Sequence, residues 1–207
     1  MTKRGNRRAP TFFEDADYAL YRDLLVQAVE RAGVEIWCYC LMPNHVHIIA
    51  VPSDEDGLRR AFADTRRRYT GFINARARWT GHLWQGRFGA VAMDEAHLAN
   101  AMRRVTLNPV RARLAERAEH WRWSSAAAHL AGRDDELVTV APALERYGDF
   151  AAFLGEDDDD EIARRRLRMA ETSGRPPGSD AWLETIAVAT GRTPRPRKRG
   201  PKLKVVD

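Results

Sequence analysis

The sequence has only two cysteines in 207 residues, Cys38 and Cys40, two positions apart. Cysteines this close in an extended strand are poorly placed to bridge, which excludes a disulfide-stapled secreted fold and predicts buried free thiols. Long apolar runs are also absent, since the longest, such as residues 48–52, are far shorter than a membrane span. The N-terminus lacks the apolar core of a signal peptide. We therefore expect a soluble, cytoplasmic protein with no membrane partner.

Acidic residues are scarce in the middle of the chain, and basic residues are scarce after it. Residues 59–122 hold fourteen arginines and five acids, a net of +9, whereas residues 133–161 hold two arginines and eleven acids, a net of −9. Residues 192–207 carry seven basic residues and one acid. The guanidinium fork of arginine matches phosphate oxygens. The basic centre therefore favours a nucleic-acid partner, with a solvated helix face as the alternative.

The spacing of apolar residues predicts helices and strands in alternation. A helix is expected over about 16–32, ended by Gly33, and then strands at 34–41 and 45–51 joined by a tight turn into an antiparallel hairpin. Further helices are expected over about 57–78, 94–107 and 110–114, with a closing strand at 91–93. This order predicts an α+β protein, a ferredoxin-like two-layer sandwich with helices on one face of an antiparallel sheet.

The length allows one well-buried domain with an appendage. We expect that domain over residues 1–130, an acidic linker over 131–161, and a small helical and basic DNA-binding-like tail over 162–207. Helices are expected in the tail at 162–170 and 180–189. The basic stretch at 193–202 is either a solvated tail or a hook for the DNA minor groove. Residues 1–10 are predicted to be a flexible or strand-connecting basic arm.

The histidines His45 and His47 open the second strand of the predicted hairpin. Side chains alternate along a strand, so both imidazoles point to one face while Val46 and Ile48 point to the other. An isolated His-x-His is more often a pair of ordinary strand histidines, although two imidazoles on one face also suit a divalent metal. The choice depends on the motifs around the pair.

Six motifs follow one another in a characteristic order: Arg-Gly-Asn-Arg-Arg at 4–8, Leu-Met-Pro-Asn-His-Val-His at 41–47, and the segments at 69–74, 81–88, 107–112 and 123–125. In this combination residues 3–130 resemble the single-tyrosine HUH transposases of insertion sequences (IS200-like), and within them the REP-associated tyrosine transposases. The resemblance implies a protein that cleaves and rejoins single-stranded or hairpin DNA near repeated palindromes.

The resemblance also implies a metal site. In that family two histidines and a polar residue on the last core helix bind one divalent ion, usually Mg²⁺ or Mn²⁺, and these positions match His45, His47 and Asn108. The ion polarises the scissile phosphate while a tyrosine four residues before the Asn attacks phosphorus. Here Arg104 stands in that position. Arginine stays protonated and offers no lone pair, so it can bind phosphate but cannot be the nucleophile. Alternatively, Asn108 is not a metal ligand but the C-cap of the helix that ends before Pro109.

No other residue is a good replacement for the missing tyrosine. Tyr39 and Tyr69 are expected to pack in the core, and Thr106 is a weaker nucleophile that faces away from Asn108. The family also has a strand before the motif at 4–8. Because only three residues precede that motif here, the first strand is expected to be missing, or the start of the reading frame is set too late.

Seven arginines in the motifs and on the basic helix are predicted to bind DNA: Arg4, Arg7, Arg8, Arg66, Arg67, Arg87 and Arg111. Four aromatic residues either stack on bases or pack in the core: Trp84, Phe88, Trp121 and Trp123. Three functions stay open, namely a transposase that transfers strands without the usual tyrosine, an inactive DNA-binding relative, and a metal-dependent phosphodiesterase that uses water. Both a monomer and a homodimer are compatible with the sequence.

Overall fold

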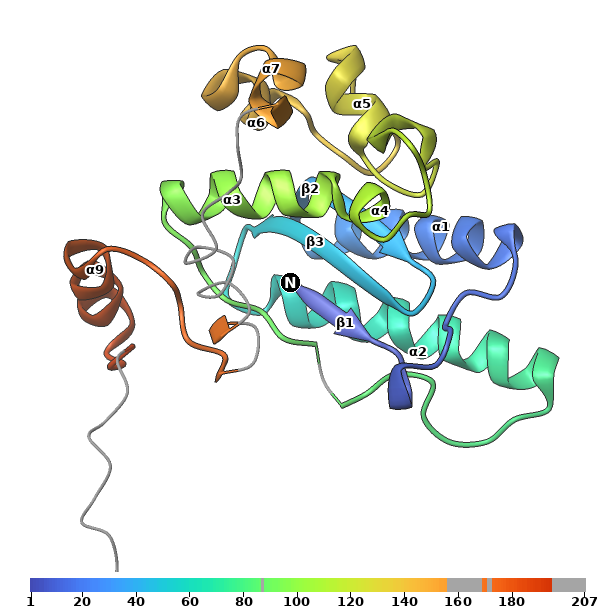
Figure 1. Cartoon of the computed structure of the whole chain (residues 1–207). Coiled ribbons are helices and arrows are strands. Elements are labelled where there is room, and N and C mark those ends of the chain that lie inside the picture. Colours follow the sequence, from blue (N-terminus) through green and yellow to red (C-terminus); the bar gives the residue numbers. More distant parts are fainter. Residues whose placement is uncertain (87, 156–168, 171–172, 195–207) are drawn as a thin grey trace, which may run out of the picture.

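A computed structural model describes residues 1–86, 88–155, 169–170 and 173–194 of the chain (Figure 1). Its sheet has three antiparallel strands in the order β1-β3-β2. β2 (Val34–Met42) and β3 (His45–Pro52) form the predicted hairpin. β1 (Thr2–Arg4) pairs with the other edge of β3, with Arg4 opposite His45. The sheet therefore brings the first residues of the chain beside the histidine pair.

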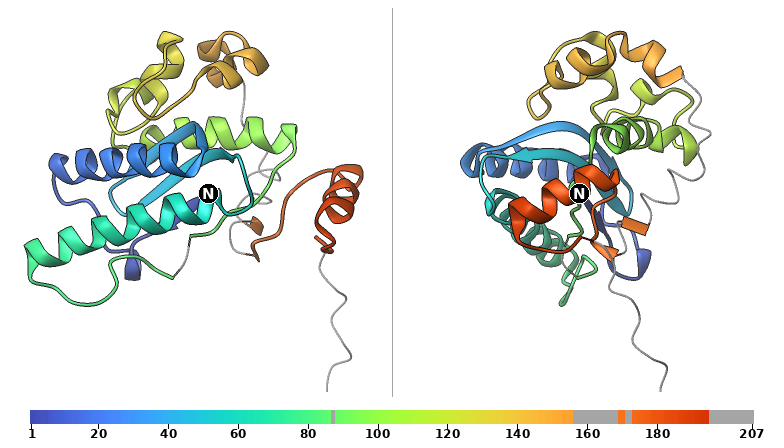
Figure 2. Two further views of the ribbon diagram at one scale, coloured as in Figure 1. Left: turned by 180° about the vertical axis from the view of Figure 1, so that it is seen from behind. Right: turned by 90° about the vertical axis from the view of Figure 1, so that its left-hand side faces the viewer.

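Two long helices cover one face of this sheet, and a third covers the other (Figures 1 and 2). α1 (Asp15–Ala32) and α2 (Gly57–Ala77) pack together on the first face, where they share a core with β2 and β3. α3 (Glu95–Thr106) packs on the second face and is followed by the short α4 (Asn108–Arg111). The chain therefore forms three layers, with the sheet in the middle.

The predicted α+β class with an antiparallel sheet is confirmed, but helices cover both faces of the sheet rather than one. The reason lies in β2, which is buried on both faces from Cys38 to Met42. Ile36, Tyr39 and Leu41 pack toward α1 and α2. Cys38, Cys40 and Met42 form an apolar strip on the opposite face, which α3 covers. Both cysteines are free and buried, as expected.

Beyond α4, a short 3₁₀ helix, η2 (Ala118–His120), leads into three further helices above α3 (Figure 1). These are α5 (Ala126–Ala131), α6 (Ala141–Tyr147) and α7 (Phe150–Gly155).

The prediction of an acidic linker over 131–161 is wrong for its described part, residues 131–155. Phe150 and Phe153 are buried in the core cluster of α3, and the backbone N–H of Thr139 donates to the carbonyl of Ile36 (2.9 Å). The apolar residues of this segment extend the core, although its net charge is acidic. Residues 156–161 lie outside the described ranges.

The predicted helix over 180–189 is present as α9 (Asp180–Thr190). Ser179 caps it and donates its backbone N–H to Asp94 Oδ2 (2.8 Å), at the start of α3. The predicted helix over 162–170 and the basic stretch at 193–202 fall mostly outside the described residues. Along the ranges that the structure describes, no helix is long and apolar enough to cross a membrane.

The short strand β1 precedes the turn at this end of the sheet, and its backbone groups pair with the edge of β3. The turn η1 (Asn6–Arg8) follows. Gly5 is required between them, since a Cβ there would lie 2.4 Å from the carbonyl oxygen of Ala9. The closing strand predicted at 91–93 is absent, and an isolated bridge between Thr2 and Gly89 lies near that position.

Candidate functional site

His45 and His47 lie at the start of β3, on the face of the sheet that α3 covers. Because side chains alternate along the strand, Val46 and Ile48 point into the core between the sheet and helices α1 and α2. The two imidazoles point to the opposite face. Their ring centroids are 4.8 Å apart, and the rings are perpendicular. His47 is buried and His45 is partly buried. Two imidazoles at this spacing can hold one small ligand between them.

Two asparagines contact His45 from different elements. The Nδ1–H of His45 donates to Asn44 Oδ1 (2.6 Å), which leaves the lone pair of Nε2 available. That Nε2 faces the side-chain amide of Asn108 at the start of α4, with Asn108 Nδ2 3.5 Å away. Asn108 is not the cap of α3, because Leu107 takes that place. Rotating the Asn108 amide by half a turn would point its oxygen toward the histidine.

Both histidines are neutral at physiological pH. Burial is the first cause that lowers the pKa of His45, to about 4, followed by the charges of Arg4 and Arg104. Burial also lowers the pKa of His47 well below its ordinary value, together with the nearby His45 and Arg104. Neutral imidazoles keep a lone pair free for a ligand, whereas imidazolium does not.

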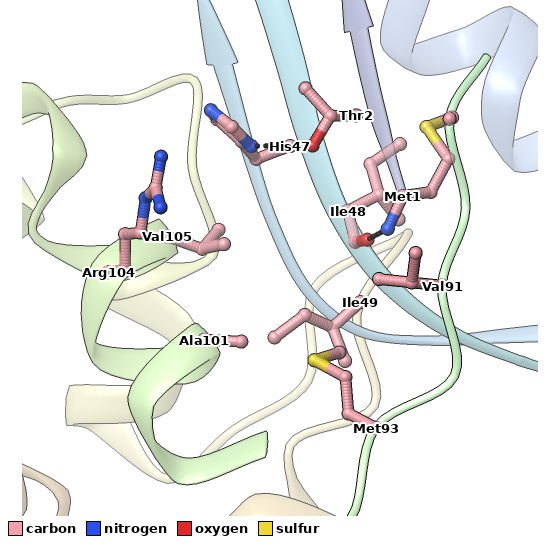
Figure 3. A pocket seen from close by; sticks show the side chains of 11 residues that line it. Met1, Thr2, His47, Ile48, Ile49, Val91, Met93, Ala101, Arg104 and Val105 are labelled. Carbon is pink, nitrogen blue, oxygen red and sulfur yellow. Dashed lines mark hydrogen bonds between the residues drawn. The ribbon is translucent and has the colours of Figure 1, made fainter. Parts of the chain in front are cut away.

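Arg104 extends from α3 toward the edge of the sheet that carries His47 (Figure 3). Both side chains line a narrow pocket together with Met1, Thr2, Ile49, Val105 and other apolar residues. Thr2 Oγ1 lies 3.1 Å from Nδ1 of His47. The position one helical turn before Asn108 therefore lies next to the histidines, and a guanidinium occupies it.

The tyrosines lie away from this group. Tyr18, Tyr21, Tyr39 and Tyr69 are buried in the core between the sheet and α1 and α2, on the face opposite the histidines. Tyr147, on α6, stacks on Phe153 with centroids 4.2 Å apart. Burial raises the pKa of Tyr147 and Tyr18 to about 12.

Among the described residues, no three or more His, Cys, Asp or Glu side chains lie close enough together to hold a metal ion. A metal site at the histidines would therefore need the Asn108 amide as its third protein ligand. Cys38 and Cys40 do not contribute, since burial raises the pKa of both thiols.

The predicted DNA-binding arginines fall into separate groups. Arg4 lies opposite His45 in the β1–β3 pair, and Arg7 and Arg8 form the turn η1 just after it. Arg66 and Arg67, on α2, line a groove with Trp84 and Gly86. Arg111 is exposed at the end of α4, and Arg87 lies outside the described residues.

The two histidines and Arg104 lie in a segment that matches a known family. The sequence model described as "Transposase IS200 like" matches residues 3–105, from β1 to α3, including both histidines and Arg104. Residues 3–105 belong to the IS200-like transposase family. The matched segment begins in the strand that pairs with His45 and ends one residue after Arg104.

A solved structure, described as a REP-associated tyrosine transposase bound to a REP hairpin, has the same fold as this IS200-like chain. The match has a TM-score of 0.52 and 19% sequence identity, and it covers 67% of this chain and 82% of the other. At this identity the likeness shows the fold. A search of curated proteins finds no match.

Two polar residues that contact the histidines were not predicted from the sequence. Asn44 lies inside the motif at 41–47, and its place beside His45 is a signal that its side chain holds the imidazole. Thr2 carries no such signal, because its contact with His47 depends on the pairing of β1 with β3.

Proposed function

We propose that this IS200-like chain binds single-stranded or hairpin DNA near repeated palindromes, as REP-associated transposases do, without forming a covalent link to it. His45, His47 and Asn108 hold a divalent ion, Mg²⁺ or Mn²⁺, next to a DNA phosphate. The observation that carries this proposal is the grouping of two neutral imidazoles with Arg104, all three from the segment that matches the transposase family, and with Asn108 just after that segment. The neighbour with the same fold was solved on a DNA hairpin.

The donor atoms fit a divalent ion of intermediate hardness. Two imidazole nitrogens and one amide oxygen suit Mn²⁺ better than Mg²⁺, which prefers oxygen ligands. When bound, the ion supplies Lewis-acid polarisation of a phosphate oxygen. The chain's own part is to fix the ligands, and Asn44 does so for His45 through its 2.6 Å hydrogen bond.

Arg4 and Arg104 bring two positive charges close to the histidines. These charges repel a metal ion but attract a phosphate. Ion and phosphate should therefore bind cooperatively, since the phosphate neutralises the arginines that oppose the ion. We expect Mn²⁺ to bind more tightly when DNA is present.

The absence of a covalent link follows from Arg104 and from the positions of the tyrosines. A protonated guanidinium cannot attack phosphorus. Four tyrosines are buried on the opposite face of the sheet, and Tyr147 packs between helices. Strand transfer through a phosphotyrosine therefore has no nucleophile near the histidines.

A labelled DNA hairpin incubated with Mn²⁺ and the chain tests the proposal, with a native gel for binding and a denaturing protein gel for covalent product. We expect binding with no covalent band. A covalent band from the unaltered chain overturns the assignment of Arg104. Cleavage without a covalent band supports a phosphodiesterase that uses water. Absence of binding at low salt overturns the proposal as a whole.

The variant Arg104→Tyr is the positive control for this experiment. If the metal ligands are correctly assigned, the new hydroxyl lies beside them and should give a covalent band in the presence of Mn²⁺. That band should disappear when His47 is also changed to Ala. Failure of Arg104→Tyr to react while still binding the hairpin would place the defect in the metal site.

A further inference from the structure

Each of the two histidines lies opposite a different residue of the strand β1. In the β1–β3 pair Arg4 is the partner of His45, and Thr2 is the partner of His47. The side chains of directly opposite residues in an antiparallel pair lie on the same face of the sheet. Thr2 therefore shares the face of His47, whereas Lys3, which precedes Arg4, points to the other face.

The backbone of Thr2 places its side chain close to His47. The N–H of Thr2 donates to the carbonyl of Gly89 (2.8 Å), and the N–H of Gly89 donates to the carbonyl of Thr2 (3.0 Å). Because both backbone groups of Thr2 bond to Gly89, Thr2 and His47 form a non-hydrogen-bonded pair, the kind in which opposite side chains approach most closely. Thr2 Oγ1 accordingly lies 3.1 Å from Nδ1 of His47 (Figure 3).

Burial makes this contact important for an imidazole that binds an ion. An imidazole that gives the lone pair of Nε2 to a metal carries its proton on Nδ1. That N–H needs an acceptor from the protein wherever water has little access. His47 is only 7% exposed, and Thr2 Oγ1 lies within hydrogen-bond distance of its Nδ1. The hydroxyl of Thr2 is therefore placed to accept this proton.

Thr2 does for His47 what Asn44 does for His45, but with a different group. Asn44 Oδ1 can only accept, and Asn44 Nδ2 donates to the carbonyl of Arg8 (3.0 Å), which fixes the orientation of the amide. A hydroxyl can accept or donate. Asn44 therefore holds His45 in one tautomer, whereas Thr2 can pair with either tautomer of His47.

We propose that Thr2 is the positioning residue of His47, and that its hydroxyl accepts the Nδ1–H of His47 when Nε2 binds the divalent ion. This inference rests on the proposed function, from which it takes the ion. It adds that β1 contributes to metal affinity through a residue that is not itself a ligand. Loss of the hydroxyl leaves a buried N–H without this acceptor in the metal-bound form, and outer partners of this kind contribute strongly to metal affinity.

The test measures the Mn²⁺ affinity of the full chain without DNA, by electron paramagnetic resonance of free Mn²⁺, for Thr2→Val and Thr2→Ser. Valine keeps the branched shape that suits a strand but lacks the hydroxyl. We expect Thr2→Val to weaken Mn²⁺ binding by about 10- to 100-fold. Thr2→Ser keeps the hydroxyl and should retain most of the affinity. Thr80→Val, at an exposed threonine in the loop after α2, is the matched control and should bind Mn²⁺ as the unaltered chain does.

A second measurement distinguishes positioning from a purely structural role. Zn²⁺ is a diamagnetic probe that suits imidazole ligands. With Zn²⁺ bound, ¹⁵N NMR should show the proton of His47 on Nδ1, in slow exchange with solvent, in the unaltered chain and in Thr2→Ser. The exchange should be fast in Thr2→Val. Without metal, Thr2→Val should bind the DNA hairpin as tightly as the unaltered chain, which shows that it is folded.

The outcomes separate the role of Thr2 from the proposed function. Equal Mn²⁺ affinities for Thr2→Val and the unaltered chain overturn the role of Thr2 and leave the proposed function standing. Equal losses with Thr2→Val and Thr2→Ser also overturn it, because the hydroxyl is then not the cause. Fast exchange of the His47 proton in the Zn²⁺-bound unaltered chain overturns it whatever the variants do. Failure of the unaltered chain to bind Mn²⁺ overturns the metal site and the role of Thr2 together.

Discussion

The two faces of the sheet bury different kinds of side chain, although the same two strands supply both. Toward α1 and α2 the strands meet aromatic rings, with Phe12 stacked on Tyr18 at 4.3 Å and Tyr69 packed against Tyr21 at 5.2 Å. Toward α3 they present, beside the apolar strip of Cys38, Cys40 and Met42, two histidines next to Arg104. The first face derives its stability from apolar area, whereas the second buries polar groups that cost stability unless they bind something.

This difference explains why Tyr39, on the strand next to the histidines, lies on the face opposite to them. A side chain changes face only when the register of its strand shifts by one residue, and the buried core of the first face prevents that shift. Tyr39 is therefore fixed beneath the sheet even though it pairs with Ile48, one residue from His47. The chemistry of the second face depends on what α3 and α4 bring to it.

The largest effect expected is the loss of a ring from the aromatic face. Tyr69 is fully buried, and its hydroxyl donates to the carbonyl of Thr11 (2.7 Å). Tyr69→Ala should lower the free energy of unfolding by about 3–5 kcal/mol, measured by urea denaturation, because it leaves a large cavity. Tyr69→Phe keeps the ring and should cost much less. Similar losses for both variants would show that the hydroxyl, not the ring, stabilises this face.

The next effect concerns the second face and should change ligand binding without changing stability much. Asn44→Ala removes the acceptor that orients His45, and it should weaken Mn²⁺ binding by about 10- to 100-fold, measured by electron paramagnetic resonance of free Mn²⁺. His120→Ala removes an exposed imidazole elsewhere and should leave Mn²⁺ affinity unchanged. Chelation of the metal should lower the free energy of unfolding of the unaltered chain, because an ion that binds only the folded chain stabilises it. Equal Mn²⁺ affinities for Asn44→Ala and the unaltered chain would remove Asn44 from the site.

A smaller effect separates two neighbouring arginines on α3. Arg104→Gln should weaken hairpin binding and reduce the slope of log affinity against log salt by about one, since one phosphate contact is lost. Arg103→Gln is the control, because Arg103 donates to the carbonyl of Phe153 (2.8 Å) and its guanidinium lies over that ring. Its salt slope should match that of the unaltered chain. If both variants change the slope equally, Arg104 has no specific contact with DNA.

The smallest effect tests a cation buried on the aromatic face. Lys3, in β1, pairs with Val46 of β3. Its ammonium group donates to the carbonyl oxygens of Gln85 (2.9 Å) and Gly86. Burial, and then the charge of Arg66, lowers the pKa of Lys3 to about 8 from 10.5.

Between about pH 8 and 10.5 the unfolded chain therefore binds more protons at Lys3 than the folded chain does. This difference makes the Lys3 contribution to stability rise with pH in that window. The unaltered chain should gain stability relative to Lys3→Met between pH 8 and 10, measured by urea denaturation at each pH. Parallel curves for the two proteins would contradict the lowered pKa.

Much of the second face was predictable because it follows from short-range geometry. Strand alternation put His45 and His47 on one face, and helical spacing put Arg104 one turn before Asn108. The hairpin, α1, α2 and α3 were predicted nearly to their observed ends for the same reason. The described part of the linker, residues 131–155, was mispredicted because net charge does not reveal that Phe150 and Phe153 pack on α3.

Long-range contacts were not predictable in this way. The sequence offered Trp84 and Trp123 as candidates for base stacking, yet both are buried, whereas Phe13, Phe72 and Trp79 are exposed. Periodicity cannot show which rings of a loop remain exposed, because exposure depends on the elements that pack over the loop.

The order of residues by itself determined the α+β class, the common face of the two histidines and the place of Arg104 one helical turn before Asn108, since each depends on positions a few residues apart. Tertiary structure alone decided that β1 pairs with the edge of β3, that Asn44 links His45 to the turn η1, and that Trp79 and Phe13 share a pocket with Arg7. These contacts join residues 36 to 72 positions apart, and only the packing of the whole domain brings such residues together.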